Sequence, residues 1–277
     1  MATRWWLVAG LAVWPLFADR QNLSCAEMEA FLREAKIGVQ RDMPKGVTVP
    51  KRATLDNGSI KHDASIQPVN IQKASYQTQR GTELNFRDFY GFNVAGYEVA
   101  KLLDMNMVPP YVERKVGGNS ASMSWMIDDA MMELDRVQKK MNPPDLESWN
   151  RQMYAARVFT QLIGNVDDNL TNFLITKDWQ LWLIDFSRAF RSMKTLPNAK
   201  NLVQCDRKLL ANLRKLDRKT LEEKLVKPRY INKMELDGLM ARRDKIVEVF
   251  DKEIAQKGEA AVLFDLPRIG EACGTGL

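Results

Sequence analysis

The sequence predicts an α+β protein of two lobes, with an antiparallel sheet and one inserted helix in the first lobe and mainly helices in the second. Two observations lead to this prediction. In the first half of the chain, short apolar segments are separated by Asn-Gly and Gly-Gly turns, which is typical of antiparallel strands. In the second half, apolar residues recur at helical spacing. Strands that precede helices, instead of alternating with them, indicate an α+β arrangement.

Composition and charge set broad limits on function. The 277 residues are 45% hydrophobic and 27% charged, which is ordinary for a globular protein. The net charge of +6 favours acidic partners such as ATP, an anionic polymer or a membrane surface. No nucleic-acid partner is expected. His62 is the only histidine, so histidine-rich zinc sites and catalytic triads without it are excluded. The three cysteines allow one disulfide but identify no pair.

Residues 1–18 have the layout of a signal peptide. Arg4 precedes an apolar segment, Trp5 to Phe17, which is too short to span a membrane comfortably. We therefore expect an exported protein, periplasmic or secreted, with no transmembrane segment after signal removal. A buried or peripheral N-terminal helix is the alternative.

The first lobe is predicted to occupy residues 19–128. Helical spacing of apolar residues predicts a helix over 26–37, followed by a loop or irregular strand over 38–50. The segment 52–69 predicts a hairpin, because Asp56-Asn57-Gly58 favours a tight turn. The polar residues 70–90 indicate no defined element.

A second helix is predicted over 93–103, with an apolar face that includes Val94 and Tyr97. Strands over 111–116 and 122–127 flank a Gly-Gly-Asn turn and complete the antiparallel sheet.

The second lobe is predicted to occupy residues 129–277 and to carry the functional site. The charged, proline-terminated segment 128–144 is a candidate hinge. Asp145 is expected to cap a helix that continues through Ile163. The remaining predicted elements, in order, are a hairpin of strands 173–175 and 181–184, helices over 200–257, and a loose tail over 265–277.

Three oxygen-bearing side chains on the loops around this hairpin form the candidate site. Asp167 precedes Asn172 by five positions, and Asp185 follows Asn172 by thirteen. Carboxylate and carboxamide oxygens suit hard cations such as Mg²⁺ or Mn²⁺. Phosphoryl transfer needs such ions on the phosphates and a residue that orients the attacking hydroxyl. We predict Asn172 and Asp185 as metal ligands and Asp167 as the catalytic residue, with Asp168 as its alternative.

The spacing of these residues, together with the Ile184-Asp185-Phe186 sequence, resembles the active site of the protein-kinase-like superfamily. It is similar to the sites of the phosphoinositide kinases and the HipA-like kinases. Gly164 to Asp167 and Val108-Pro109-Pro110 also resemble the secretory-pathway casein kinases, and the chain is similar to exported bacterial proteins of this kinase-like group. The resemblance implies a two-lobed protein-kinase-like fold, ATP as the nucleotide and a hydroxyl group as the acceptor. The sequence does not identify that acceptor: a protein, a lipid, a sugar and a small molecule all stay open.

The chain departs from the kinase pattern where a Lys–Glu ion pair normally contacts the nucleotide phosphates. Gln67 occupies the expected Lys position and Asn93 the expected Glu position. We expect a hydrogen bond between these two amides to replace the ion pair. Asp128, at the start of the candidate hinge, is predicted together with them as a nucleotide-contacting residue.

Neighbouring charged residues are poor substitutes for the missing pair. Lys61 lies six residues before Gln67, roughly 20 Å away along a strand. Glu98 falls on another face of its helix. Lys73 and Arg80 lie in the segment without a predicted element and stay open as substitutes. No glycine-rich phosphate loop precedes Arg52, and residues 45–48 are the only weak replacement.

Three hypotheses follow for function. The first is an exported ATP-dependent phosphotransferase that uses Mg²⁺ or Mn²⁺. The second is a pseudokinase that binds nucleotide or acts as a scaffold without the Lys–Glu pair. The third is a structural exported protein in which these acids only cap turns.

Overall fold

The computed structural model describes residues 23–43, 50–78, 81–167 and 169–267. The predicted signal peptide, the weak phosphate-loop candidate at residues 45–48, Arg80, Asp168 and most of the predicted tail therefore lie outside the described residues. In the described parts of the chain, no helix is long and apolar enough to cross a membrane.

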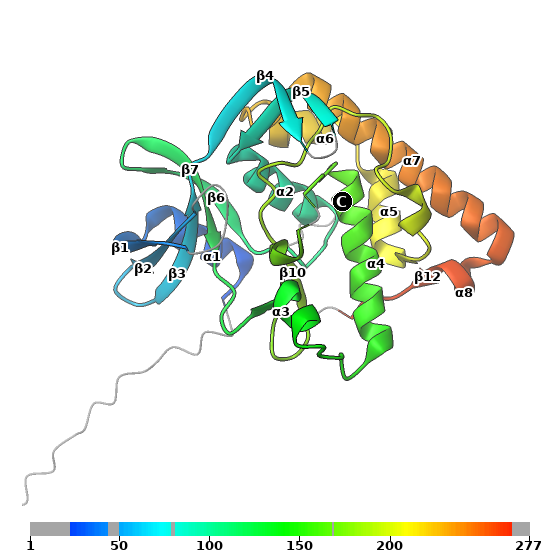
Figure 1. Ribbon diagram of the computed structural model, residues 1–277, viewed down its shortest axis with the longest axis horizontal. Helices are drawn as coiled ribbons and strands as arrows, with labels where there is room; N and C mark the ends of the chain where they lie inside the picture. Colours follow the sequence, from blue (N-terminus) through cyan, green and yellow to red (C-terminus); the bar gives the residue numbers. More distant parts are fainter. Residues whose placement is uncertain (1–22, 44–49, 79–80, 168, 268–277) are drawn as a thin grey trace, which may run out of the picture.

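A five-stranded antiparallel sheet forms the first lobe (Figure 1). Its order is β1-β2-β3-β7-β6, with β1 Lys36–Asp42, β2 Lys51–Asp56, β3 Lys61–Gln67, β6 Tyr111–Val116 and β7 Asn119–Trp125. Helix α1 (Cys25–Glu34) packs against β6 and β7 and buries Phe31 and Leu32 in the core of this lobe. The predicted hairpin with its Asn-Gly turn is confirmed.

The first predicted helix was placed correctly but extended too far. Ser24 caps its start through a reciprocal hydrogen-bond pair with Glu27, and the helix ends at Glu34. Ile37 and the residues after it form β1, where an irregular segment was predicted. A register shift between Ile37 and Gln40 explains why no clean alternation is visible in the sequence.

Residues 70–90, predicted to lack a defined element, form a separate hairpin of β4 (Asn70–Thr78) and β5 (Gly81–Phe89). It extends from the first lobe across to the start of the long helix α7 (Figure 1). Most of its residues are exposed, so it shows little of the alternation between apolar and polar residues from which a strand is predicted.

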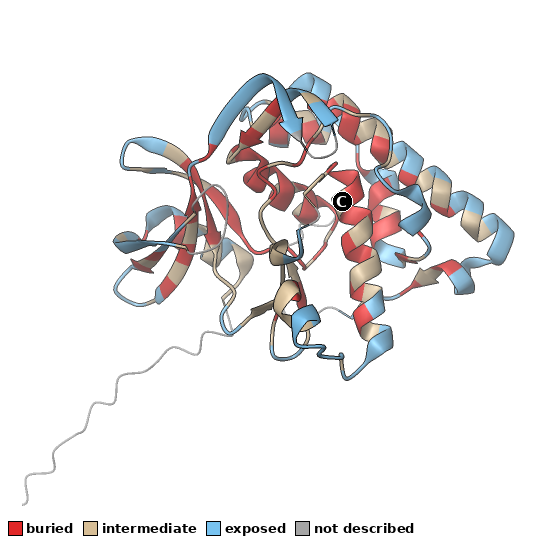
Figure 2. Cartoon of the chain, viewed as in Figure 1, coloured by how far each residue is buried: buried red, intermediate tan, exposed pale blue. Residues whose placement is uncertain are grey.

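Helix α2 (Gly91–Leu102) is buried along most of its length, as Figure 2 shows. It belongs to the large core shared with the second lobe. A Cβ atom at Gly96 would lie 2.6 Å from the Phe186 ring, so only glycine allows this close approach. The helix therefore fixes the residue that follows Asp185.

The second lobe is mainly helical. Asp145 caps α4 by accepting hydrogen bonds from the backbone of Glu147 and Ser148, as predicted. Its helices are α3 Glu133–Gln138, α4 Leu146–Leu162, α5 Arg207–Lys215, α6 Arg218–Leu221, the π-helical η4 Glu222–Val226, α7 Lys233–Lys257 and α8 Glu259–Val262, with the 3₁₀ turns η2 Leu170–Asn172 and η3 Ala199–Asn201.

Two small sheets complete this lobe. The predicted hairpin is present as β9 (Phe173–Ile175) and β10 (Leu181–Leu183), and β8 (Met131–Met132) joins it on the β9 side. A parallel pair, β11 (Cys205–Asp206) and β12 (Leu263–Phe264), closes the far end. The candidate hinge 128–144 thus contains β8 and α3 and is partly ordered structure.

Candidate active site

A cavity of about 400 Å³ lies between the five-stranded sheet and the β9–β10 hairpin. We call it the smaller cavity. Its wall combines apolar side chains with the oxygen-bearing residues singled out in the sequence. The lining residues that matter here are Gln67, Trp125, Met132, Asn172, Ile184 and Asp185. The structure therefore places Gln67, Asn172 and Asp185, which are far apart in sequence, around one space.

The predicted hydrogen bond between Gln67 and Asn93 is present. Asn93 is fully buried and donates through Nδ2 to Gln67 Oε1 and, at 3.0 Å, to Ser122 Oγ. Gln67 in turn donates through Nε2 to Asp185 Oδ1 at 3.3 Å. The Asn93 Oδ1 atom accepts from the backbone N–H of Phe186 at 2.6 Å. Two neutral amides thus connect β3, α2 and the strand end that carries Asp185.

Asp185 occupies a constrained position after β10. Its backbone has φ of 57°, a left-handed conformation that is uncommon outside glycine. Burial raises the pKa of its carboxyl above the ordinary value, and the nearby charge of Asp167 adds to the increase. Hydrogen bonds from Ser187 and Gln67 oppose this shift. A bound cation would restore the ionised form, because an adjacent positive charge favours a carboxylate.

Asn172 lines the same cavity as Asp185. Its backbone accepts from the Ile184 N–H at 3.0 Å, which ties the two loops together, but its side-chain nitrogen is buried with no hydrogen-bond partner. Buried polar groups are normally paired, so this unpaired amide nitrogen is a donor left for a ligand, whereas a cation would bind the carboxamide oxygen. Among the described residues no group of three His, Cys, Asp or Glu could hold a metal by itself. The donor set still fits Mg²⁺ or Mn²⁺, because such ions are commonly bound by one or two carboxylates plus substrate phosphates.

Asp167 lies on the loop between α4 and η2, partly exposed. Its backbone N–H donates to Asn165 Oδ1 at 3.1 Å, and its Oδ1 accepts from the Asn169 N–H at 3.3 Å. Among the described residues of this turn, neither of these two bonds uses its second carboxylate oxygen, Oδ2. Because the charge of Asp167 raises the pKa of Asp185, the two carboxylates lie near each other.

Arg242 of α7 holds the base of this loop. Its fully buried guanidinium donates to Leu162 O at 2.9 Å and to Arg191 O at 2.7 Å. Burial lowers its pKa to about 10. Gly164, at φ of +60°, lies so close that a Cβ atom would be 2.7 Å from the guanidinium carbon. This arginine therefore couples the loop of Asp167 to the segment after Asp185, a contact that no local sequence pattern predicts.

The remaining sequence candidates lie elsewhere. Asp128 pairs with His62 at 3.2 Å and does not line the smaller cavity, whereas Asp135 does. Lys73 sits over the Tyr76 ring on β4, away from this cavity. Glu98 pairs with Lys101 at 2.7 Å. Among the described residues, no lysine or arginine lines the smaller cavity.

Tyr111 is a site residue that sequence reasoning missed. Its buried hydroxyl accepts from the Asp185 backbone N–H at 3.3 Å, and burial raises its pKa. Tyr111 directly follows Val108-Pro109-Pro110. A tyrosine at the start of a strand is usually interpreted as a core residue, so no sequence pattern predicts this contact.

Comparison with solved structures identifies the architecture. A Fam20 protein of hydra, whose structure contains a sugar, matches 87% of this chain and 92% of its own, with 11% identity and a TM-score of 0.63. The Golgi casein kinase with Mn/ADP bound matches 88% and 80%, with 14% identity and a TM-score of 0.62. The proinflammatory kinase CtkA of Helicobacter pylori matches 82% and 98%, with 8% identity and a TM-score of 0.50. The chain has a protein-kinase-like fold.

At these identities the likeness establishes the fold alone. No protein-family model matches the sequence, and no curated protein matches it either. The activity must therefore be argued from the site.

Proposed function

We propose that the protein is an ATP-dependent phosphotransferase that transfers the γ-phosphate to a hydroxyl group. The observation that carries this proposal is the convergence of Asn172 and Asp185 on one cavity, with Asp167 close to Asp185. The kinase-like fold supports it, and the Golgi casein kinase of the same fold binds Mn/ADP.

The smaller cavity suits a nucleotide. Trp125, Met126 and Ile127 supply an apolar wall on which a base can rest, and Asn172 and Asp185 provide oxygens farther along. We assign Asn172 and Asp185 as the residues that hold Mg²⁺ or Mn²⁺. Such an ion, when bound, neutralises charge on the phosphate oxygens.

The chain's own residues would then position the reactants. Gln67 keeps Asp185 oriented through its hydrogen bond, and Asn93 fixes the backbone of Phe186. Asp167 accepts a hydrogen bond from the acceptor hydroxyl and orients its oxygen toward the phosphate. The Asp128 carboxylate pairs with His62, and we assign Asp128 no role in this step.

Thermal unfolding with ATP and Mn²⁺ tests the binding half of the proposal. We expect the melting temperature to rise with both present and the rise to be lost in Asp185→Ala. Absence of any rise across nucleotides and metals would instead support a structural role. For the catalytic half, transfer of radiolabelled γ-phosphate should fall about 10²–10⁴-fold in Asp167→Ala, the range expected when a general base is removed.

A pseudokinase is the second candidate, and one specific observation favours it. The position of the phosphate-contacting ion pair is occupied by the neutral Gln67–Asn93 hydrogen bond. If wild-type protein binds nucleotide but transfers no more phosphate than Asp167→Ala, this second function is the correct one.

We also propose that the protein acts outside the cytoplasm, because the apolar segment 5–17 after Arg4 has signal-peptide composition. Fractionation of cells that express the full chain, with N-terminal sequencing of the product, checks this. A product found only in the cytoplasm with residues 1–18 intact would contradict it.

A further inference from the structure

A cavity of about 870 Å³ opens beside the candidate catalytic loop. We call it the larger cavity. Its wall is formed by the β4–β5 hairpin, by residues 190–193 after Asp185, and by the start of α7. Val166, the residue before Asp167, also lines it. Asp167 follows Val166 in the chain, and its charge influences Asp185, which lines the smaller cavity.

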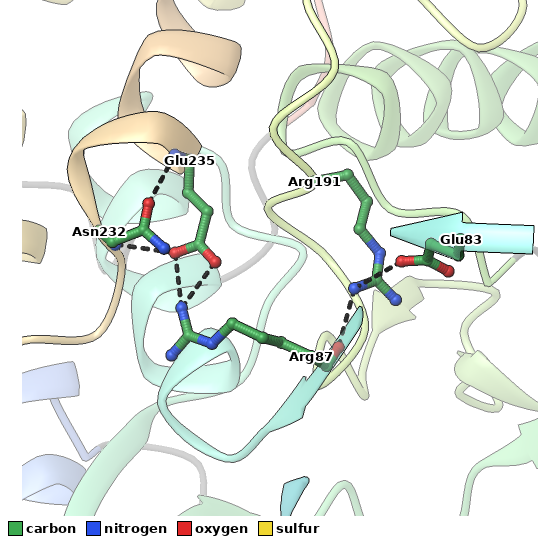
Figure 3. Close-up of polar contacts among 5 residues, drawn as sticks. All are labelled: Glu83, Arg87, Arg191, Asn232 and Glu235. Atoms are coloured by element: carbon green, nitrogen blue, oxygen red, sulfur yellow. Dashed lines mark hydrogen bonds and ion pairs between the residues drawn. The ribbon is translucent and has the colours of Figure 1, made fainter. Parts of the chain in front are cut away.

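Two arginines of the larger cavity are paired with glutamates (Figure 3). Arg87 of β5 donates through Nη1 to Glu235 at 2.6 and 2.7 Å, and Glu235 also closes the capping box of α7 with Asn232. Arg191 contacts Glu83 at 2.9 Å and donates to the backbone oxygen of Arg87 at 2.8 Å. These pairs attach the hairpin to the second lobe.

Arg188, the third arginine of this cavity, forms no ion pair with any described residue, and its Nε is buried without a hydrogen-bond partner. Arg188 and Arg191 both lie over the Phe86 ring, at 5.3 and 5.2 Å. Among the described residues that line this cavity, three are arginines and two are glutamates.

Unused donors accompany this excess charge. The Arg191 side chain is only 10% exposed, yet its Nε and Nη2 have no hydrogen-bond partner. Burial raises the pKa of the Asp88 carboxyl, and the charges of Arg188 and Arg191 lower it by less. Within the described chain, Asp88 forms no ion pair with either arginine. Buried guanidinium donors without partners are costly, and an oxyanion would satisfy them.

We infer that the larger cavity is the acceptor site and that it binds an acceptor carrying an anionic group, a carboxylate or a phosphate, on Arg188 and Arg191. This inference rests on the proposed function. The anionic group binds the guanidinium groups beneath the hairpin, and the acceptor hydroxyl extends past Val166 to Asp167. Neutral alcohols lack the group that the unused donors require, so the site selects against them.

Calorimetric titration of the full chain without nucleotide tests the anion site directly. The probes are glycerate, glycerol 3-phosphate and glycerol, which share hydroxyl groups and differ in the anionic group. We expect saturable binding of at least one anion and none of glycerol, and the stronger anion identifies carboxylate or phosphate as the preferred group. Arg188→Gln should weaken that binding about tenfold or more, as expected for lost charge-assisted hydrogen bonds.

Arg151→Gln is the matched control, because Arg151 lies on α4 and lines neither cavity; its affinity should equal that of wild type. If Arg188→Gln does not fold, Met234→Glu replaces it, since Met234 is 60% exposed and lines the larger cavity. The added negative charge should weaken anion binding. No binding of either anion by wild type at millimolar concentration, or unchanged affinity in the folded variant, would overturn the inference.

The two proposals fail separately. Anion binding without a nucleotide-dependent rise in melting temperature would overturn the proposed function and leave the anion site. A nucleotide-dependent rise without anion binding would overturn only the acceptor assignment.

Discussion

Asp185 is held in the smaller cavity by the neutral amides of Gln67 and Asn93, whereas the wall of the larger cavity is held by ion pairs of Arg87 and Arg191. The described residues place no lysine or arginine on the smaller cavity and three arginines on the larger one. The two regions thus stabilise neighbouring parts of one site by opposite means.

The difference has a consequence for the proposed reaction. On the smaller-cavity side, neutral hydrogen bonds preserve the geometry of β3, α2 and Asp185 without placing a permanent positive charge on nucleotide phosphates. Charge neutralisation there would depend on the bound metal ion. On the larger-cavity side, the permanent positive charge is available to an anionic acceptor.

Breaking the amide connection should have the largest effect on stability. Asn93→Ala removes the hydrogen-bond partners of the Phe186 N–H and of Gln67 Oε1 at a fully buried position. We expect the free energy of unfolding to fall by about 3 kcal/mol, since each unsatisfied buried group costs ~1–3 kcal/mol. Urea denaturation measures this loss, and the nucleotide-dependent rise in melting temperature should disappear as well.

Asn212→Ala is the matched control for this variant. Asn212 is also buried and donates to the Leu103 backbone oxygen at 2.9 Å, but it lines neither cavity. It should lower stability and leave nucleotide binding unchanged. Equal losses of nucleotide binding in both variants would mean that the Asn93 effect is only general destabilisation.

The ion pairs of the larger cavity should contribute less. Arg87→Met removes a pair in which the side chains are 19% and 8% exposed, and Glu235 keeps its hydrogen bond from Asn232. We expect a loss of about 1–2 kcal/mol, because partly buried charged hydrogen bonds exceed surface pairs in strength. Denaturant titration measures the loss, and hydrogen exchange should increase in β4 and β5.

Arg218→Met gives the comparison for a solvated pair. Arg218 and Asp237 are each 46% exposed, so their separation should cost no more than about 0.5 kcal/mol. If the two arginine variants lose the same stability, the hairpin is not attached through Arg87.

Parts of the molecule with local signals could be predicted from the sequence. The Asp145 cap, the Asn-Gly hairpin and the spacing of Asp167, Asn172 and Asp185 all depend on residues near one another in the chain. The Gln67–Asn93 hydrogen bond could be predicted because the kinase resemblance brought two distant segments together.

Other features depended on contacts that no local pattern reveals. The β4–β5 hairpin exposes most of its residues, so it lacks an apolar face from which strands are predicted. Arg188, Arg191 and Arg242 were interpreted as ordinary basic residues of a solvated surface. Arg242 is instead fully buried, and Arg188 and Arg191 line the larger cavity. Asp128 was predicted as a nucleotide contact from its place at the start of the candidate hinge, and its pairing with His62 has no local sequence signal.

The last prediction restores charge to the smaller cavity. Combining Gln67→Lys with Asn93→Glu would place an ion pair where the two amides now meet. We expect the double variant to bind ATP with Mn²⁺ about tenfold more tightly than wild type, equivalent to about 1.4 kcal/mol, because the added ammonium faces the phosphates. Gln67→Lys alone should gain less, since the new ammonium would pair with Asp185 and compete with the metal ion. Calorimetric titration of wild type, of each single variant and of the double variant with ATP and Mn²⁺ measures the coupling between the two positions. If the double variant binds no more tightly than wild type, the neutral amide pair does not limit nucleotide affinity, and the contrast in charge between the two cavities has no bearing on how the nucleotide is held.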